Sequence, residues 1–237
     1  MKAIILAAGF ATRLYPLTLN KSKSFLEIKG KPIIDFIFEK IEEIKEIDEI
    51  IIVTNNNFYQ DFLNWKGDRE NVTILNDGVT ELNKKLGAIG DLLFVINKEN
   101  IDDDFLLISG DNLFNYSLIQ PFEIFKKEKM DLSLFYDIKN KEEAKRFGVA
   151  LIKNNLLIDF EEKPQNPKST LCSSSTYFFR KETIPIIKEF VSKGSADQPG
   201  LFLQYLYKII PIYAYIVEGK WLDIGTKEAL EQAQREF

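Results

Sequence analysis

The chain has 237 residues, 45% of them hydrophobic, with one cysteine, no histidine and a formal charge of −5. The lack of histidine excludes Ser-His-Asp hydrolysis and the usual zinc sites, and a single cysteine excludes an intramolecular disulfide and a cysteine-cluster metal site. Because the sequence has no basic stripes and no apolar run as long as a membrane span, we expect a cytoplasmic protein that binds neither nucleic acid nor membranes.

The first predicted strand, Ala3 to Ala7, breaks at Gly9 into a loop of small residues that ends in Arg13. Small side chains let an anion come within hydrogen-bonding distance of the main chain. Six basic residues and one acidic residue lie between positions 1 and 32, in a chain that is acidic as a whole. This local positive charge, to which Lys23 contributes, predicts a site for a polyanionic small molecule. The alternative is a plain strand followed by a glycine turn.

Strands and helices alternate in the next part of the chain. Apolar residues at helical spacing follow Pro32, and two apolar runs predict strands that end near Asn55 and Asn76. This alternation predicts an α/β fold with a doubly wound, mostly parallel sheet and a ligand at the carboxyl ends of the strands. The predicted elements are a helix over 32–44, a strand over 49–54, a short helix over 58–65, a strand over 72–76 and a helix entered near residue 87.

A fully apolar strand over 105–109 runs into Asp111, which is either a helix cap or a metal ligand facing the ligand crevice. Without histidine, any metal would be held by carboxylate oxygens, which suit magnesium. A small antiparallel piece with an Asn154-Asn155 turn is expected at the edge of the sheet, where it would cover the crevice. The remaining predicted elements are strands over 131–136, 147–153, 156–164, 173–179 and 212–217, helices over 141–146, 183–192 and 197–206, and a terminal helix capped by Thr226.

Four motifs are spread over nearly the whole chain. They are Leu6-Ala-Ala-Gly-Phe-Ala-Thr-Arg-Leu14 with Lys23, Gly110-Asp-Asn-x-Phe114, Glu161-Glu-Lys-Pro164 and Trp221-x-Asp-x-Gly-Thr226. Together they resemble the signature of the sugar-1-phosphate nucleotidyltransferases, typified by glucose-1-phosphate thymidylyltransferase. The resemblance implies a Rossmann-like nucleotidyltransferase fold. It also implies a reaction in which an NTP and a sugar 1-phosphate give an NDP-sugar and pyrophosphate, with Mg²⁺ as the cofactor.

The resemblance also implies roles for individual residues, in a single domain over 1–237 that would be a monomer or a small homo-oligomer. The expected catalytic residues are Arg13, Lys23 and Asp111, and the expected magnesium ligands are Asp111 and Asp223. Residues up to about 130 would bind the nucleotide, through Ala7, Ala8, Gly9, Ala11, Thr12, Arg13, Asn76, Gly87 and Ala88. Residues from about 131 to 225 would bind the sugar phosphate, through Gly148, Glu162, Lys163 and Tyr177.

Three departures from the family pattern keep other functions open. The usual glycine before Thr-Arg is Ala11, the usual proline before the signature lysine is Ser22, and serines at 173–175 lie where a glycine often contacts the sugar. A left-handed Ala11 would cost on the order of 1 kcal/mol. The alternatives are a non-catalytic, nucleotide-sensing relative and an enzyme that uses another phosphorylated alcohol such as phosphocholine.

Two motifs also have a purely structural interpretation. Gly87 suits either contact with the nucleotide base or tight packing at a helix start, whereas Gly90 suits packing. The run Glu161-Glu162-Lys163 is either a solvated strand end or part of the site, and the Pro164 that follows favours the site. Neither the base nor the sugar is identified by these residues.

Overall fold

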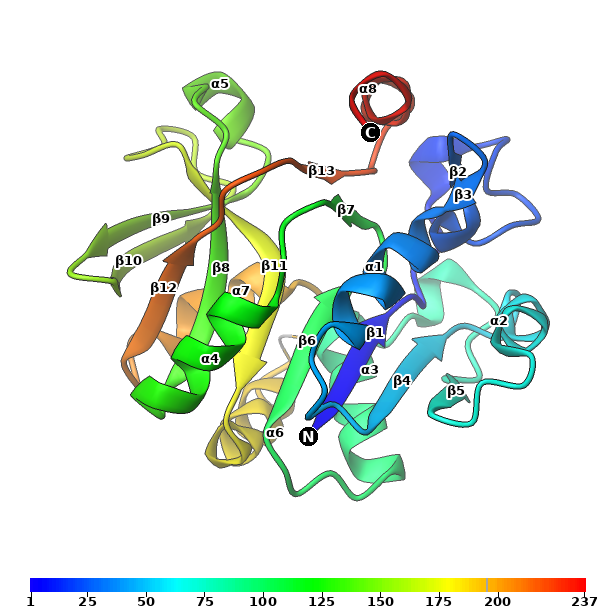
Figure 1. The fold of residues 1–237 in the computed structure, drawn as a ribbon, viewed down its shortest axis with the longest axis horizontal. Coiled ribbons are helices and arrows are strands. Elements are labelled where there is room, and N and C mark those ends of the chain that lie inside the picture. Colours follow the sequence, from blue (N-terminus) through cyan, green and yellow to red (C-terminus); the bar gives the residue numbers. More distant parts are fainter. Residues whose placement is uncertain (195) are drawn as a thin grey trace.

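The computed structural model describes residues 1–194 and 196–237, and its centre is one nine-stranded sheet. The strand order is β5-β4-β1-β6-β11-β8-β12-β10-β9 (Figure 1). The strands are β1 (Lys2–Leu6), β4 (Glu49–Thr54), β5 (Val72–Asn76), β6 (Phe105–Ser109), β8 (Asp131–Asp137), β9 (Gly148–Lys153), β10 (Leu156–Glu162), β11 (Leu171–Phe179) and β12 (Ile212–Ile216). Of these strands, only β10 and β11 run against the common direction. The predicted mostly parallel sheet is confirmed.

Helices cover both faces of this sheet, so that it is doubly wound as predicted (Figure 1). Along β1, Ala3 and Ile5 belong to the core that contains α1 and α4, whereas Ile4 belongs to the core that contains α3, α6 and α7. A sheet buried on both faces requires such continuous apolar strands. The helices are α1 (Ile33–Glu42), α2 (Tyr59–Lys66), α3 (Ala88–Lys98), α4 (Ile119–Glu128), α5 (Lys141–Ala144), α6 (Ile184–Ser192), α7 (Pro199–Leu206) and α8 (Lys227–Glu236).

The strands β9 and β10 form the predicted antiparallel hairpin at the edge of the sheet. Its turn residues, Asn154 and Asn155, have φ of 51° and 59°. A two-residue hairpin turn requires this left-handed conformation, which asparagine tolerates. β9 also pairs back onto β11, where Val149 lies opposite Cys172, so this end of the sheet curls round.

A second, two-stranded sheet was not predicted from the sequence. It pairs β7 (Asn112–Phe114) with β13 (Trp221–Asp223) in antiparallel register, so that Asp223 lies opposite Asn112. The Ile224 N–H donates to the Asp111 carbonyl over 3.2 Å and continues the pairing. This small sheet therefore brings two segments that are distant in the sequence to the same place.

The terminal helix α8 follows β13 directly and begins with the predicted cap. The Thr226 hydroxyl accepts a hydrogen bond from the Ala229 N–H over 3.2 Å. Gln234 then fixes α8 on a short hairpin, because its Nε2 donates to the Glu27 carbonyl over 2.6 Å. This hairpin, β2 (Glu27–Ile28) with β3 (Lys31–Pro32), was not among the elements predicted from the sequence.

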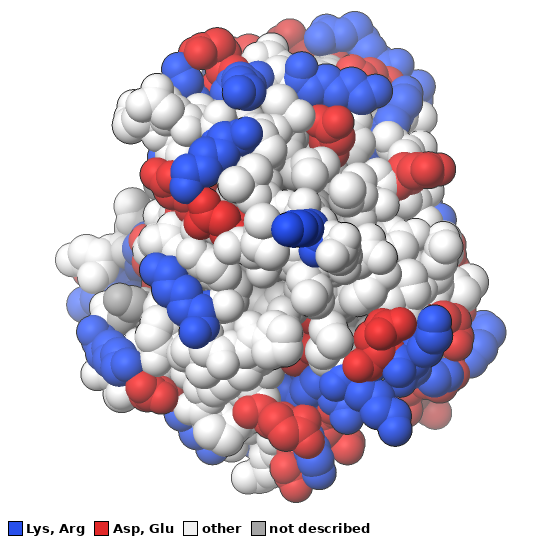
Figure 2. Space-filling model, turned by 90° about the vertical axis from the view of Figure 1, so that its left-hand side faces the viewer, with Lys and Arg blue, Asp and Glu red and all other residues white. Residues whose placement is uncertain are grey.

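The charged side chains on the face with the β9–β10 hairpin are of both signs (Figure 2). Lys and Arg alternate there with Asp and Glu around a largely uncharged centre. β10 contributes Leu156 and Ile158, which are exposed. Within residues 1–194 and 196–237, no helix combines the length and the apolar composition that crossing a membrane requires.

Candidate active site

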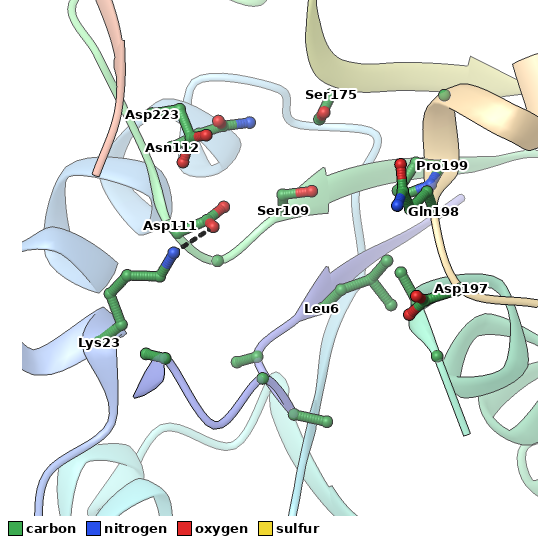
Figure 3. A pocket seen from close by; sticks show the side chains of 18 of the residues that line it. Leu6, Lys23, Ser109, Asp111, Asn112, Ser175, Asp197, Gln198, Pro199 and Asp223 are labelled. Carbon is green, nitrogen blue, oxygen red and sulfur yellow. Dashed lines mark hydrogen bonds and ion pairs between the residues drawn. The ribbon is translucent and has the colours of Figure 1, made fainter. Parts of the chain in front are cut away.

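A cavity of about 470 Å³ opens at the carboxyl ends of β1 and β6, where the sequence predicted the ligand. Figure 3 shows that Lys23, Asp111 and Asp223 lie on one side of it and Asp197 and Gln198 on the other. The predicted residues that line it are Ala7, Ala8, Gly9, Ala11, Thr12, Arg13, Lys23, Gly87, Ala88, Asp111, Gly148, Glu162, Lys163, Tyr177 and Asp223. The structure therefore brings together residues from both parts of the chain.

Asn76 is the one predicted site residue that does not line this cavity. It ends β5, and its side chain serves the local turn instead. Its Oδ1 accepts from the Gly78 N–H over 2.8 Å, and its Nδ2 donates to Asn56 over 2.9 Å. A residue at the carboxyl end of a parallel strand does not necessarily turn its side chain into the cavity, and Asn76 does not.

The loop after β1 is held in shape by hydrogen bonds from the side chains of Asn55 and Thr18. The buried Asn55 side chain donates from Nδ2 to the Ala8 carbonyl over 2.9 Å, and the Thr18 hydroxyl donates to the Ala11 carbonyl over 2.8 Å. The loop then enters a 3-10 turn over Thr12–Leu14, which presents Arg13 to solvent at the cavity. This shape leaves small residues along the wall, as an anion site requires.

Both departures in this loop fit the conformation that the family residues would have. Ala11 has φ of 49°, the left-handed region that favours glycine. Ser22 has φ of −58°, which is the value that proline fixes. Its hydroxyl also caps the 3-10 turn over Lys23–Phe25, since it accepts from the Ser24 N–H over 3.4 Å. The backbone is thus kept even though the residues differ.

Three charged groups meet where β7 and β13 pair. Lys23 Nζ lies 2.5 Å from Asp111 Oδ2, and both side chains are partly buried (Figure 3). Asp223 Oδ1 is buried and has no hydrogen-bond partner among the described residues. Burial and the Asp111 charge raise the pKa of Asp223, while Lys23, Arg13 and Arg146 lower it. The two carboxylates therefore repel each other at the edge of a cavity whose positive charges offset them only in part.

On the side of the cavity that was predicted to bind the sugar phosphate, two glycines make room for one carboxylate. A Cβ on Gly148 would lie 2.7 Å from Glu162 Oε2, and a Cβ on Gly200 would overlap the same atom. Burial raises the pKa of Glu162, against the charge of Lys163, whose Nζ lies 3.5 Å from Oε1. Lys163 also donates to Gln198 Oε1 over 3.0 Å. Glu162 is thus held as a largely enclosed acceptor in the cavity wall.

The serine segment forms a bulge in β11 beside this carboxylate. The register with β8 shifts between Ser173 and Tyr177, and Ser175 has φ of 51°. The Ser173 hydroxyl and the Tyr177 phenol are 3.1 Å apart and share a hydrogen bond. Ser173 and Ser175 both line the cavity, so the bulge turns hydroxyl groups toward it.

At the opposite end, the start of α3 packs against the segment before α7. The N–H groups of Ala88 and Ile89 donate to the carbonyls of Asp197 and Ala196 over 3.1 and 2.8 Å. A Cβ on Gly87, whose φ is 82°, would lie 2.6 Å from the Ala196 oxygen. Gly87 therefore has the packing role that was one of its two interpretations, and it also lines the cavity.

Several residues that line the cavity were not predicted, notably Asp91, Arg146 and Gln198. Arg146 lies two residues before Gly148, and a basic residue so close to a predicted site residue was a usable signal. Asp91 is a charged residue within an otherwise apolar helix face, which was a second such signal. Gln198 carried none, because it lies in a loop that only the fold brings to Lys163.

Comparison with known proteins gives the same assignment over the whole length. The family model for nucleotidyl transferases matches residues 2–237. The chain is 31% identical, over 99% of its length, to the bifunctional protein GlmU of Methanocaldococcus jannaschii. It is 27% identical, over 95% of its length, to a putative mannose-1-phosphate guanyltransferase of Sulfolobus acidocaldarius. The chain spans 54% and 60% of the lengths of these two relatives.

A solved structure shows the same fold. The putative glucose-1-phosphate thymidylyltransferase from Bacillus anthracis, crystallised in complex with a sucrose, superposes with a TM-score of 0.86 at 27% identity. The alignment covers 99% of this chain and 94% of that one. The resemblance drawn from the four motifs is confirmed, and the chain belongs to the nucleotidyl transferase family.

Proposed function

We propose that the chain joins an NTP to a sugar 1-phosphate, giving an NDP-sugar and pyrophosphate, in a reaction that depends on Mg²⁺. The observation that carries this proposal is the meeting of Lys23, Asp111 and Asp223 at one end of a cavity. The loop Gly9–Arg13 forms the adjoining wall. Carboxylates beside an anion-binding loop have an evident use only if a cation lies between them and the anion.

The two aspartates fit Mg²⁺. Asp223 Oδ1 is buried without a hydrogen-bond partner among the described residues, which is unfavourable unless a cation binds it. In the part of the chain that the structure describes, no group of three or more His, Cys, Asp or Glu residues is placed to hold a metal. Mg²⁺ usually takes one or two carboxylates and completes its shell with substrate phosphates and water. When bound, it would neutralise charge on the phosphates that meet during transfer.

The chain's own residues supply the rest of the chemistry. A sugar phosphate oxygen is already ionised near neutral pH, because its second pKa is about 6, so no general base is needed. That oxygen forms a bond to the α-phosphorus while the bond to the bridging oxygen of pyrophosphate breaks. Lys23 would steady the α-phosphate and the incoming phosphate, and the exposed Arg13 would hold the leaving pyrophosphate.

The two parts of the cavity suit the two substrates. The loop of small residues after β1 and the start of α3 would hold the nucleotide. Gly148, Glu162, Lys163 and Tyr177 would hold the sugar phosphate, with the Glu162 carboxylate accepting from sugar hydroxyl groups. Ala11 and Ser22 have φ values that suit glycine and proline, so these two departures from the family pattern do not argue against a working phosphate loop.

Incubation with each NTP, Mg²⁺ and a panel of sugar 1-phosphates, with pyrophosphate as the readout, tests the proposal. Lys23→Ala is expected to lower kcat by about 100-fold or more, because one positive charge at the reacting phosphates is lost. Lys21→Ala is the matched control, since Lys21 lies two residues away and outside the cavity, where it pairs with Glu27 at 3.5 Å. No pyrophosphate with any pair of substrates, or equal losses in both variants, would refute the proposal.

For the setting of the enzyme we keep the expectations from the sequence. We propose that it works in the cytoplasm as a monomer or small homo-oligomer. Sedimentation of the purified chain over a range of concentrations distinguishes these two states.

A further inference from the structure

The bulge in β11 places a conformationally strained residue in the cavity wall. Ser175 has φ of 51°, in the left-handed region where a residue with a Cβ is less stable than glycine. The other described non-glycine residues with positive φ lie in turns, in loops or at helix ends, whereas Ser175 lies within a strand. Bulges often redirect a side chain next to an active site, and strained residues cluster at functional sites. The conformation of Ser175 therefore indicates a role for its side chain.

The bulge directs successive serines to opposite sides of the strand. The Ser174 hydroxyl is buried and donates to the Leu134 carbonyl over 3.2 Å, away from the cavity. Ser173 and Ser175 both line the cavity, and Ser173 Oγ accepts from the Ser175 N–H over 3.3 Å. In Figure 3 the Ser175 side chain points into the cavity. A hydroxyl group can donate one hydrogen bond and accept two, so Ser175 has the capacity to contact a ligand there.

The groups around Ser175 are hydroxyl groups and one carboxylate. Ser175 and Ser109 are the first residues beyond the paired part of β11 and β6, and both line the cavity. Burial and the Glu162 charge raise the pKa of Tyr177 to about 12. The hydroxyl of Ser175 acts against this shift, so Ser175, Tyr177 and Glu162 are neighbours. This part of the wall therefore offers several uncharged hydrogen-bonding groups beside one acceptor that carries a negative charge.

Such a wall suits a sugar ring better than a phosphate. An anion would be repelled by the Glu162 carboxylate, which Lys163 offsets only in part from 3.5 Å away. The hydroxyl groups of a sugar can instead donate to this carboxylate and exchange hydrogen bonds with serine and tyrosine. The two cations assigned to the phosphates, Lys23 and Arg13, lie on the segment after β1 rather than in this part of the wall.

Resting on the proposed function, we propose that Ser175 selects the sugar, and that the chain prefers hexose 1-phosphates with only hydroxyl groups to those with an acetamido group. The Ser175 hydroxyl bonds to a ring hydroxyl, and its side chain fills space that glycine, the residue favoured by this φ, would leave open. An acetamido group is much larger than the hydroxyl that it replaces. The wall at Glu162 cannot retreat to admit it, because Gly148 and Gly200 pack directly on that carboxylate.

Pyrophosphate release from glucose, galactose and mannose 1-phosphates and from their 2-acetamido counterparts, with each NTP and Mg²⁺, tests this inference. Wild type is expected to have a kcat/KM about 10- to 200-fold higher for the hydroxyl sugar, the range that a small change of volume in a substrate pocket produces. In Ser175→Gly, which keeps the left-handed backbone, this preference should fall below about threefold. Ser174→Ala is the matched control and should keep the preference, since Ser174 does not line the cavity.

The outcomes separate this inference from the reaction itself. An acetamido sugar used as well as its hydroxyl counterpart, or a preference that survives in Ser175→Gly, would overturn the role of Ser175 and leave the proposed function standing. No pyrophosphate from any pair of substrates would overturn both. In Ser175→Ala the KM for the hydroxyl sugar should rise, and an unchanged KM would refute the hydrogen bond. The melting temperature of Ser175→Gly is the folding control and should match wild type, because glycine relieves the strained φ but adds entropy to the unfolded chain.

Discussion

At the scale of single residues, the site tolerates two unusual side chains because the backbone carries the geometry. Ala11 takes the left-handed φ of 49° and Ser22 a φ of −58°, so each residue occupies the conformation of the glycine or proline that it replaces. The carbonyl of Ala11 is fixed by Thr18, and the Ser22 hydroxyl adds a cap that proline lacks. The loop is therefore defined by its hydrogen bonds more than by residue identity.

Ala11→Gly should change stability and activity little if the hydrogen bonds of the loop, rather than the residue at position 11, define its shape. Glycine removes the left-handed cost of about 1 kcal/mol but adds a similar entropy to the unfolded chain. We therefore expect an unfolding free energy within about 1 kcal/mol of wild type and activity within about tenfold. Ala11→Val, with a β-branched side chain at the same φ, should lose clearly more stability. An inert wild type that only Ala11→Gly activates would identify a decayed enzyme.

Asp91 should make the stability of the chain depend on pH, with the unfolding free energy falling as pH rises. Burial and the Asp77 charge raise its pKa to about 7, whereas an unfolded aspartate titrates near 4. Between these values the folded chain holds a proton that the unfolded chain has released. The unfolding free energy from this group therefore falls as pH rises from about 4 to about 7, by at most about 4 kcal/mol.

Denaturant unfolding of wild type and Asp91→Asn measures this effect. The variant should gain stability relative to wild type as pH rises through that window, and the gain should level off above about pH 7. If the difference in unfolding free energy between wild type and Asp91→Asn is the same at every pH, Asp91 titrates normally in the folded chain.

At the scale of elements, the start of α3 is shaped by two glycines with different duties. Gly87 has φ of 82°, and a Cβ there would lie 2.6 Å from the Ala196 oxygen. Gly90 lies in the first helical turn, where a Cβ would lie 3.1 Å from Leu86 Cβ, a side-chain atom that can give way. Close packing, rather than the helix itself, explains why Gly87 is needed.

Gly87→Ala and Gly90→Ala form a matched pair that tests this difference. Gly87→Ala should destabilise the chain by about 2 kcal/mol or more, because both the backbone conformation and the contact are incompatible with a side chain. Gly90→Ala should stay within about 1 kcal/mol of wild type, since the gain in helix propensity offsets the tight contact. Urea midpoints measure both. Equal effects would mean that Gly87 is a simple helix-start glycine.

The sequence predicted the long elements well because their apolar patterns are unambiguous. The central residues of β1, β4 and β6 form continuous apolar runs, as strands buried on both faces require, and the three strands were assigned correctly. The three-residue strands β7 and β13 were missed, because so short a segment has no readable periodicity. Their pairing depends on a contact between distant segments, which only the fold reveals.

Most residues that line the cavity and belong to a recognised motif were predicted, whereas Asp91, Arg146 and Gln198 were not. The family pattern placed Asp223 correctly at the cavity without any knowledge of β13. Asp91 went unnoticed because it reads as one polar position on a helix, and its burial depends on the neighbouring β5 turn that holds Asp77. Asn76 shows the opposite error, since a strand end was taken as a site residue and its side chain serves a turn.

At the scale of the whole molecule, two halves of the chain share one cavity, and they are joined by the β6–β11 pairing of the main sheet and by the β7–β13 pairing. Asp111 follows β6 in the first half, and Asp223 ends β13 in the second. Their side chains converge beside Lys23 (Figure 3). A cation bound here would also tie the C-terminal segment to the sheet, so metal binding and the joining of the halves should be coupled.

The convergence of the two aspartates yields the strongest prediction. Asp111→Asn and Asp223→Asn should each lower turnover by about 100-fold or more, because each would remove one carboxylate ligand of the proposed Mg²⁺. Neither should unfold the metal-free chain, and relief of the carboxylate repulsion should leave its melting temperature unchanged or higher. Asp68→Asn, an exposed aspartate outside the cavity, is the control that should match wild type.

The double variant and Mg²⁺ titrations complete this test. Because the two ligands act as a unit, the double variant should be scarcely worse than either single one, whereas independent sites would show additive losses. Mg²⁺ added together with an NTP should raise the melting temperature of wild type and of Asp68→Asn, but not that of the Asp111 and Asp223 variants. A shared metal is ruled out if either single variant keeps wild-type turnover and Mg²⁺ dependence, since one ion held by both carboxylates must respond to the loss of each.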